Sequence, residues 1–364
     1  MKFTGNQEEL LFLLQSAAKI VPPKTSINYL EGIYLETEGN YLKIAATNLE
    51  AGIKNFLPVE VKEEGKAVLP PKFTDIVRLS GEKELEVQVD ENFNAHIYGG
   101  TSRFLIKGID PQDYPQLTPW EGEEDWKIKT STFKSMVRHS LISVSHDEGK
   151  PALTGVLFRV EDDTLTLVST DSFRLTIRKG KIENHGSNKG LYLIPLKILN
   201  ELVKFNFSQD YIKVKVVKNQ VLFKIDDFLF ISRLLDEKFP QVERIIPDKY
   251  DTFFKVSRNN LISALQRVMI ISEGNNYIFK IMINDDNMIF KSDSQLGSIE
   301  EEIKGDKEGE DVEIYLNSRF LLDFLRSMEE EEVIMNFNGS TGPFVFDYNK
   351  DEEKFFHLIL PIKG

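Results

Sequence analysis

The chain has 364 residues, of which 41% are hydrophobic and 28% charged, with a formal net charge of −13 and no cysteine. This length and composition predict a soluble globular protein of two or three domains, each with its own core. The lack of cysteine excludes disulfides and thiolate chemistry. The acidic excess argues against a nucleic-acid-binding protein of the usual basic kind, unless Lys and Arg are concentrated on one surface.

Neither a membrane span nor a secretory signal is predicted. No apolar run approaches the roughly 18 residues needed to cross a bilayer. The segment Leu10–Ala18 has the length of a signal-peptide core, but Glu8 and Glu9 precede it where basic residues belong, and Gln15 interrupts it. We interpret this segment as an amphipathic helix and expect a cytoplasmic protein.

One pattern of strand, polar corner and strand recurs along the chain. It is clearest in Leu165–Thr176, it returns in Tyr41–Glu50, and it appears more loosely in Met288–Leu296. Asn and Asp suit such corners because their short side chains bond nearby backbone and tolerate unusual φ. The corner residues are almost equally spaced: Asn48, Asp171 and Asp293. We therefore expect three copies of one unit.

The first unit opens with a helix over Gln7–Val21, whose apolar residues fall on one face and which Pro22-Pro23 ends. Alternating strands follow over Leu30–Leu57, with a turn at Glu38–Asn40. A second helix follows Pro70-Pro71, with Gly81 as its stop. The last strands of the unit are Leu85–Val89, Ala95–Tyr98 and Ser102–Ile106.

The second and third units repeat this order. In the second, Ser131 is the expected N-cap of the first helix, and the other helix follows Pro195. In the third, Ser257 and Asn317 are the expected caps of the two helices. Each unit thus reads as helix, strands, helix, strands. We predict an α+β fold of three tandem domains, at residues 1–120, 121–247 and 248–364.

Catalytic and metal-binding patterns are missing from the sequence. The five histidines show no paired-ligand spacing, and there is no phosphate-binding loop, dinucleotide-binding glycine motif or nucleophile elbow. Most carboxylates fall in charge runs such as Glu329–Glu332, which are typical of solvated faces. We expect no enzyme, no metal and no cofactor.

Basic residues recur on the second helix of each unit. Lys197 and Lys204, like Arg319 and Arg326, are seven residues apart, which puts both charges on one helical face. The six-residue spacing of Lys72 and Arg78 fits less well. Each face alone could be ordinary solvated surface. Together they favour one cationic surface that contacts phosphates without reading bases.

Three apolar segments beside turns can be either core or a binding site: Leu153 with Thr170–Leu175, Pro240–Ile245, and Leu358–Ile362. The residues alone leave that choice open.

Over its whole length the chain resembles the bacterial sliding clamps, the beta subunits of DNA polymerase III. The resemblance rests on the opening Met1–Thr4, the corner Thr170–Leu175, Phe239-Pro240 with Arg244, Asn317-Ser318 before a helix, and Leu360-Pro361-Ile362. Any one of these motifs is weak, but their order and spacing over the full length, with the threefold repeat, are specific.

The resemblance implies a ring in which two chains close head to tail, so that six similar domains surround duplex DNA with helices inside and sheets outside. Such a ring slides and holds the polymerase on its template. The implied DNA contacts are Lys24, Arg103, Lys197, Lys204, Arg319 and Arg326. The implied dimer contacts are Phe104, Ile270 and Ile271.

The resemblance also implies a pocket for short linear peptides of the replicative polymerase alpha subunit, the clamp loader, repair polymerases and mismatch-repair proteins. Carried over by position, its residues are Leu153, Thr170, Ser172, Phe173, Arg174, Leu175, Pro240, Arg244, Ile245, Leu358, Leu360 and Ile362. The chain departs from common family residues at Phe173, where members often have His, and at Leu360 and Ile362, where some have Met. These departures affect the rim of the pocket and its peptide preference.

The sequence leaves two alternatives to a DNA-encircling clamp. One is an enzyme on a threefold β-rich scaffold, which would need two carboxylates converging in a cleft; the sequence places no such pair. The other is a clamp-like paralogue that binds peptides without closing on DNA.

Overall fold

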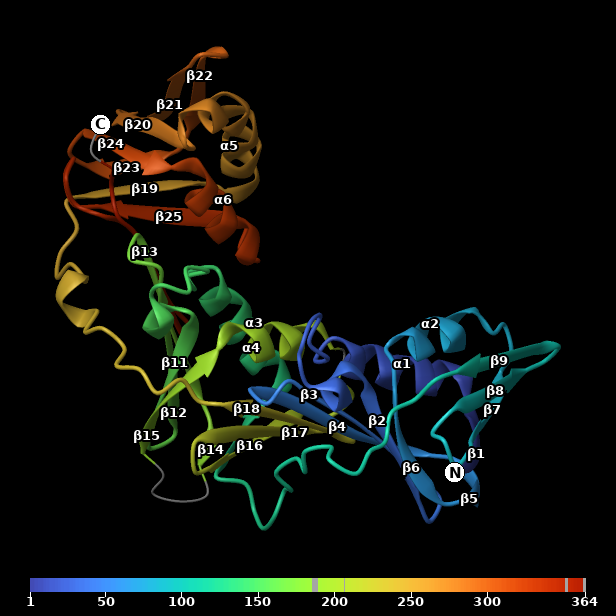
Figure 1. The fold of residues 1–364 in the computed structure, drawn as a ribbon. Coiled ribbons are helices and arrows are strands. Elements are labelled where there is room, and N and C mark those ends of the chain that lie inside the picture. Colours follow the sequence, from blue (N-terminus) through green and yellow to red (C-terminus); the bar gives the residue numbers. More distant parts are fainter. Residues whose placement is uncertain (185–188, 206, 351–352, 363–364) are drawn as a thin grey trace. The chain divides into compact units, whose positions relative to one another are not determined.

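The computed structural model describes residues 1–184, 189–205, 207–350 and 353–362. The chain forms two compact units, the first made of Met1–Lys127 with Asn206–Leu234 and the second of Ile128–Phe205 with Leu235–Gly364. Along the chain, the order of helix, strands, helix and strands occurs three times (Figure 1).

The first unit contains two sheets and two helices. One sheet has the strand order β5-β1-β7-β8-β9. The other contains, in this order, β16-β17-β18-β4-β3-β2-β6. Helices α1 (Gln7–Ala18) and α2 (Lys72–Leu79) pack against each other. The strands are β1 (Lys2–Asn6), β2 (Ile33–Glu38), β3 (Tyr41–Thr47), β4 (Ala51–Pro58), β5 (Glu60–Glu63), β6 (Gly65–Leu69), β7 (Glu84–Val89), β8 (Ala95–Gly99), β9 (Ser102–Ile106), β16 (Tyr211–Val217), β17 (Gln220–Ile225) and β18 (Phe228–Arg233).

The second unit contains a nine-stranded sheet with the order β15-β11-β12-β13-β27-β26-β25-β19-β23 and a four-stranded sheet with the order β22-β21-β20-β24. Its helices are α3 (Thr130–Leu141), α4 (Leu196–Lys204), α5 (Arg258–Ser272) and α6 (Ser318–Ser327). The strands of the larger sheet are β11 (Gly155–Glu161), β12 (Thr164–Thr170), β13 (Arg174–Lys181), β15 (Gly190–Pro195), β19 (Thr252–Ser257), β23 (Asp306–Gly309), β25 (Glu332–Phe337), β26 (Phe344–Lys350) and β27 (Glu353–Ile359). The smaller sheet consists of β20 (Ile278–Asn284), β21 (Asn287–Ser294), β22 (Gly297–Lys304) and β24 (Val312–Asn317). Two further short strands of the chain, outside this sheet, are β10 (Trp126–Lys129) and β14 (Glu183–Asn184).

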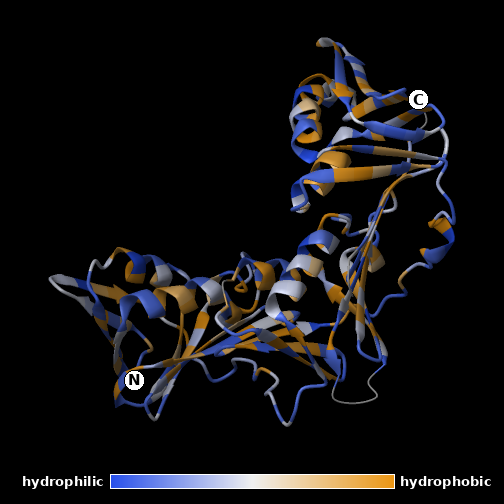
Figure 2. Ribbon diagram, turned by 180° about the vertical axis from the view of Figure 1, so that it is seen from behind, coloured by the Kyte–Doolittle hydropathy of each residue, from blue (hydrophilic) through white to orange (hydrophobic). Residues whose placement is uncertain are grey.

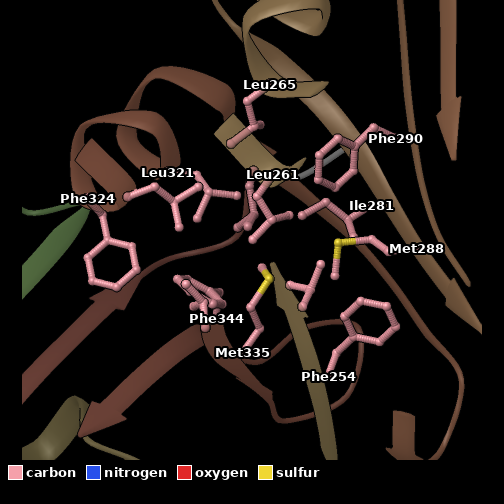
Figure 3. Packing of buried hydrophobic residues seen from close by; sticks show 14 of the residues in the cluster. Phe254, Leu261, Leu265, Ile281, Met288, Phe290, Leu321, Phe324, Met335 and Phe344 are labelled. Atoms are coloured by element: carbon pink, nitrogen blue, oxygen red, sulfur yellow. The ribbon is translucent and has the colours of Figure 1, made fainter. Parts of the chain in front are cut away.

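The core of the second unit shows why these segments fold as they do. Helices α5 and α6 lie side by side (Figure 1). Their buried apolar residues belong to one cluster that they share with the strands. Leu261 and Leu265 of α5, Phe324 of α6, and Ile281 and Phe290 of the sheet are all fully buried in one cluster (Figure 3). Burying each such side chain stabilises the fold by about 1.5–3 kcal/mol before entropy costs. Along β19, β20 and β24, buried residues alternate with more exposed ones, as expected for sheets with one covered face. Strands β12 and β27 are instead buried almost throughout. Apolar and polar residues are thus interleaved along the ribbon (Figure 2).

Most predicted elements are present, and three local predictions need correction. Helix α1 ends at Ala18 rather than Val21 because Pro22 disfavours helical backbone at the residue before it. Ser131 is not an N-cap, because α3 already begins at Thr130. Asp293 is not a corner, because it pairs with Ser298 inside the β21–β22 ladder. The turn comes later, where Ser294 Oγ accepts the backbone N–H of Leu296 at 3.2 Å.

None of the helices formed by the described residues combines the length and the apolar character needed to cross a bilayer.

Candidate functional site

The corner between β12 and β13 is held by its own side chains. Thr170 Oγ1 donates to the carbonyl of Arg174 at 2.7 Å. Asp171 Oδ1 accepts the backbone N–H groups of Phe173 and Arg174 at 2.9 and 3.0 Å. Ser172 has φ of +83°, a conformation that costs energy for a non-glycine residue. These bonds fix the corner and turn Phe173, 57% exposed, toward solvent.

The segment after β27 is docked beside this corner. In the β13–β27 ladder Leu175 pairs with Leu358, and beyond the ladder the N–H of Leu360 donates to the carbonyl of Phe173 at 2.8 Å. The N–H of Ile362 then donates to the carbonyl of Tyr315 at 2.8 Å. The described part of the tail is thus tied down by backbone bonds on both sides.

An apolar cluster lies beneath the corner. Leu175 and Leu358 are fully buried in it, Val242 of the connecting segment packs there, and Leu360 covers its edge. Leu175 and Leu358 are two of the predicted pocket residues. They therefore lie buried beneath the site and do not form an exposed wall of it. Half-buried Leu360 remains available to a ligand.

A hollow of about 440 Å³ opens next to the corner and is lined by the corner together with α6. The guanidinium of Arg174 lies 4.3 Å from the centroid of the Phe320 ring. It also bonds to Asp171 at 2.9 Å and to Asp323 at 3.1 Å. The Phe173 ring stacks on Phe320 with centroids 6.3 Å apart. The hollow thus presents the rings of Phe173 and Phe320 beside the Arg174 guanidinium, which its two carboxylate partners hold in place.

Phe320 and Asp323 were missed by the sequence reasoning. Phe320 belongs to the apolar face of α6 and packs against the core, but its half-buried ring also lies against Arg174. Asn317 gave a usable signal, because its side chain caps α6 by accepting the N–H groups of Arg319 and Phe320. A capped helix start places the next residues at a defined surface.

Other predicted pocket residues lie apart from this hollow. Pro240 lines a second hollow, of about 680 Å³, together with Leu157, Leu193 and Phe239. Arg244 and Ile245 are exposed on the short helix Glu243–Ile245 and do not belong to the apolar cluster under the corner. Leu153 is buried, and its carbonyl accepts the N–H of Ser145 at 2.9 Å.

All six predicted DNA-contacting residues are exposed. Lys197 and Lys204 lie on α4, and Arg319 and Arg326 on α6, while Arg103 lies on strand β9 and Lys24 in a loop. Only weak local partners are seen for two of them: Lys204 pairs with Glu201 at 2.9 Å, and the guanidinium of Arg319 lies 5.9 Å from the Tyr277 ring.

Basic residues of the first helices are engaged instead. Arg258 donates to the carbonyls of Leu325 and Met328, closing the end of α6, and Arg267 pairs with Glu301 at 2.7 Å.

The predicted dimer residues are partly exposed. Ile270 near the end of α5 is 66% exposed, Phe104 on β9 is 36% exposed, and Ile271 is half-buried.

Two histidines are buried between α3, α6 and β27. His139 stacks on Phe355 at 4.3 Å, and His357 stacks on Phe324 at 4.6 Å. Burial, with the nearby positive charge of Arg178, lowers the pKa of His139 to about 4. Burial, with the charge of Arg174, lowers the pKa of His357 well below its usual range. Both rings are therefore neutral packing elements at pH 7.

No three His, Asp or Glu side chains of the described residues are grouped so that they could hold a metal ion.

Comparisons with known proteins agree over the whole length. Family models match in three blocks: the N-terminal domain of the DNA polymerase III beta subunit at residues 1–118, its central domain at 127–241 and its C-terminal domain at 243–363. The beta sliding clamps of Staphylococcus epidermidis and Halalkalibacterium halodurans are each 31% identical, with all of this chain and 99% and 100% of theirs covered. The solved sliding clamp of Bacillus subtilis superposes with a TM-score of 0.94 at 29% identity, covering 100% of this chain and 99% of that one. The Thermotoga maritima beta subunit gives 0.92 at 28%, with the same coverage.

Proposed function

Because the chain belongs to the DNA polymerase III beta-subunit family, the bacterial sliding clamps, we propose that two copies close head to tail into a ring around duplex DNA. The family is a non-catalytic processivity factor. Each chain contributes three domains, at residues 1–120, 121–247 and 248–364, so that six domains complete the ring. The ring slides on DNA in the bacterial cytoplasm and tethers the polymerase to its template.

The proposed DNA surface is made of helices and a few loop and strand residues. The exposed Lys197, Lys204, Arg319 and Arg326 lie on α4 and α6, the second helices of their domains. Lys24 and Arg103 add charge from the first domain. Contacts to phosphates carry no information about base sequence, so they let the ring slide. A net charge of −13 is compatible with this surface if the acidic residues lie elsewhere.

The proposed ring contact joins β9 of one chain to the end of α5 of the next. Exposed Ile270 and partly exposed Phe104 support it, because apolar side chains at such positions gain from being covered. The contact is heterologous, yet it closes after two chains because each chain holds three of the six similar domains.

The proposed partner site is the hollow beside the β12–β13 corner. It takes short linear peptides of the polymerase alpha subunit, the clamp loader, repair polymerases and mismatch-repair proteins. The rings of Phe173 and Phe320 and the guanidinium of Arg174 line this hollow. Together with half-buried Leu360, at the edge of the apolar cluster under the corner, they support binding of a peptide that carries a Leu-Phe pair. Pro240, Arg244 and Ile245, which family position also assigns to the partner site, do not line this hollow.

The end-to-end match to three consecutive clamp-domain models carries the proposal. The test is retention after treatment with a clamp loader, on nicked circular DNA and on the same DNA made linear. A ring stays on the circle and runs off free ends, so the expected result is retention on the circle alone. Equal loss from both substrates, or equal retention on both, would contradict encirclement.

A further inference from the structure

The first unit repeats the backbone frame of the corner site. Strands β2, β3, β4 and β18 are connected and ordered like β11, β12, β13 and β27. Thr47 Oγ1 donates to the carbonyl of Ala51 at 2.8 Å, as Thr170 does to that of Arg174. Asn48 Oδ1 accepts the N–H of Ala51 at 2.7 Å, matching Asp171. The same device therefore builds both corners.

The connecting segments also correspond. In the second unit, Phe239 and Val242 pack on the sheet beside Leu157 and Val168. In the first unit, Tyr114 and Leu117 pack beside Tyr34 and Ala45. Each segment crosses its sheet with an aromatic-Pro-Gln-aliphatic sequence, Tyr114–Leu117 or Phe239–Val242.

The side chains on this face differ in charge. Lys54 pairs with Ala45 and Leu229 in its ladders, as Ile177 pairs with Val168 and Phe356, so Lys54 takes the register position of Ile177.

A second exchange lies one strand further along. Lys224 pairs with Leu229, as Asp347 pairs with Phe356. An aliphatic and an acidic residue of the second unit are thus both replaced by lysines in the first.

Lys54, together with Lys43 of β3, borders a hollow of about 320 Å³, which we call the Lys54 hollow. It is lined by Tyr34, Lys43, Ala45, Lys54, Pro115, Gln116, Leu117 and Pro119. Its volume is at the lower end of the range for ligand sites. One side is apolar, and the other carries two ammonium groups.

The ammonium group of Lys54 lies 5.7 Å from the centroid of the Phe56 ring and has no stronger partner among the described residues. Lys43 pairs with Glu36 at 2.8 Å, whereas Lys54 meets no carboxylate among the described residues. Burial, together with repulsion from Lys43 and Lys224, lowers the pKa of Lys54. A half-buried cation among like charges is stabilised by an incoming anion.

We propose that the Lys54 hollow binds an acidic peptide segment of a protein partner, with a carboxylate held by Lys54 and Lys43 and a neighbouring aliphatic side chain against Leu117. The mixed lining favours a peptide because only part of it is cationic. Single-stranded nucleic acid is disfavoured because the Tyr34 and Tyr114 rings, 4% and 5% exposed, stack on each other at 4.9 Å and offer no free face to a base.

The test uses fluorescein-labelled acetyl-Gly-Asp-Leu-Asp-Leu-Gly-amide and its Asn-for-Asp counterpart, followed by anisotropy on the full chain at low salt. Lys54→Met keeps the apolar stem and should weaken binding about tenfold, because one charge-assisted hydrogen bond is removed. Lys54→Arg should retain affinity. The matched control is Lys83→Met, an exposed lysine between α2 and β7 outside the hollow, which should bind like the unchanged chain.

The Asn counterpart should bind the unchanged chain about as weakly as the acidic peptide binds Lys54→Met. This comparison of the two peptides uses only the unchanged chain, so it tests the proposal even if Lys54→Met does not fold. Equal affinities of the two peptides would overturn the proposal. So would displacement of the acidic peptide by a Gln-x-x-Leu-Phe peptide, which would place it in the other hollow. Tighter, Lys54-dependent binding of a thymidine oligonucleotide would assign the hollow to nucleic acid instead.

Discussion

Replacing Phe320 by alanine should weaken peptide binding at the corner more than it weakens the fold. The ring is half-buried and holds two other groups, because it lies 4.3 Å from the Arg174 guanidinium and stacks on Phe173. A cation–π contact at a partly exposed site contributes about 0.5–1 kcal/mol, and an aromatic pair about 0.5–1.5 kcal/mol. Without the ring, Phe173 and Arg174 must be ordered when the peptide binds, at about 0.5–1.5 kcal/mol each.

The expected loss is therefore about 1–3 kcal/mol, which corresponds to a roughly fivefold to 150-fold rise in Kd. Calorimetric titration of a Gln-x-x-Leu-Phe peptide measures it. Phe253→Ala is the matched control, because Phe253 is a partly exposed phenylalanine on β19, outside this hollow. A chain shortened to end at Ile359 should lose about as much affinity, since it removes Leu360 from the edge of the site. Equal affinities for Phe320→Ala and Phe253→Ala would refute the assignment of the hollow.

Three further predictions concern stability, assembly and DNA. Acid should destabilise the fold between about pH 6.5 and 4, because His139 and His357 stay neutral in the folded chain while the same residues of the unfolded chain take up protons. The loss of unfolding free energy due to His139 reaches about 3 kcal/mol near pH 4. It should appear as a lower urea midpoint, and the acid effect should be smaller in His139→Gln. Ile270→Asp with Ile271→Asp should give a folded monomer in light scattering, whereas a monomeric unchanged chain at micromolar concentration would contradict the ring. Arg326→Glu should lower the salt slope of DNA binding by roughly 0.9 for each phosphate that the variant no longer neutralises, and a change in base preference would contradict sliding.

Local signals in the sequence located much of the fold. The cap at Asn317 is confirmed by two backbone bonds, and the corner at Asp171 by two more. Such features depend on residues within three or four positions of each other, so one stretch of sequence contains both partners. The turn predicted at Glu38–Asn40 follows the same logic, with φ of +56° at Gly39. The resemblance to the clamp family is confirmed by the matching domain models.

Long-range partners escaped sequence reasoning for a physical reason. Arg174 and Asp323 are 149 residues apart, and nothing in either segment specifies the other. The stacking of Phe320 on Phe173 likewise arises only because β27 pairs with β13 and brings α6 to the corner. Residue types at family positions named Arg174 as part of a site, but not what holds it.

The two corner sites separate what the repeat conserves from what it leaves open. Thr47 and Thr170 each donate to the carbonyl four residues later and so close the two corners in the same way, which makes the repeat visible in sequence at these positions. Lys54 and Ile177 share a register position, but the backbone is indifferent to which of them stands there. Side chains on that face are constrained by what binds them, provided that they can be accommodated beside the connecting segment. If the two hollows bind different ligands, as we propose, Lys54→Met should weaken binding of the acidic peptide alone and Phe320→Ala that of the Gln-x-x-Leu-Phe peptide alone. An equal effect of either variant on both peptides would contradict this.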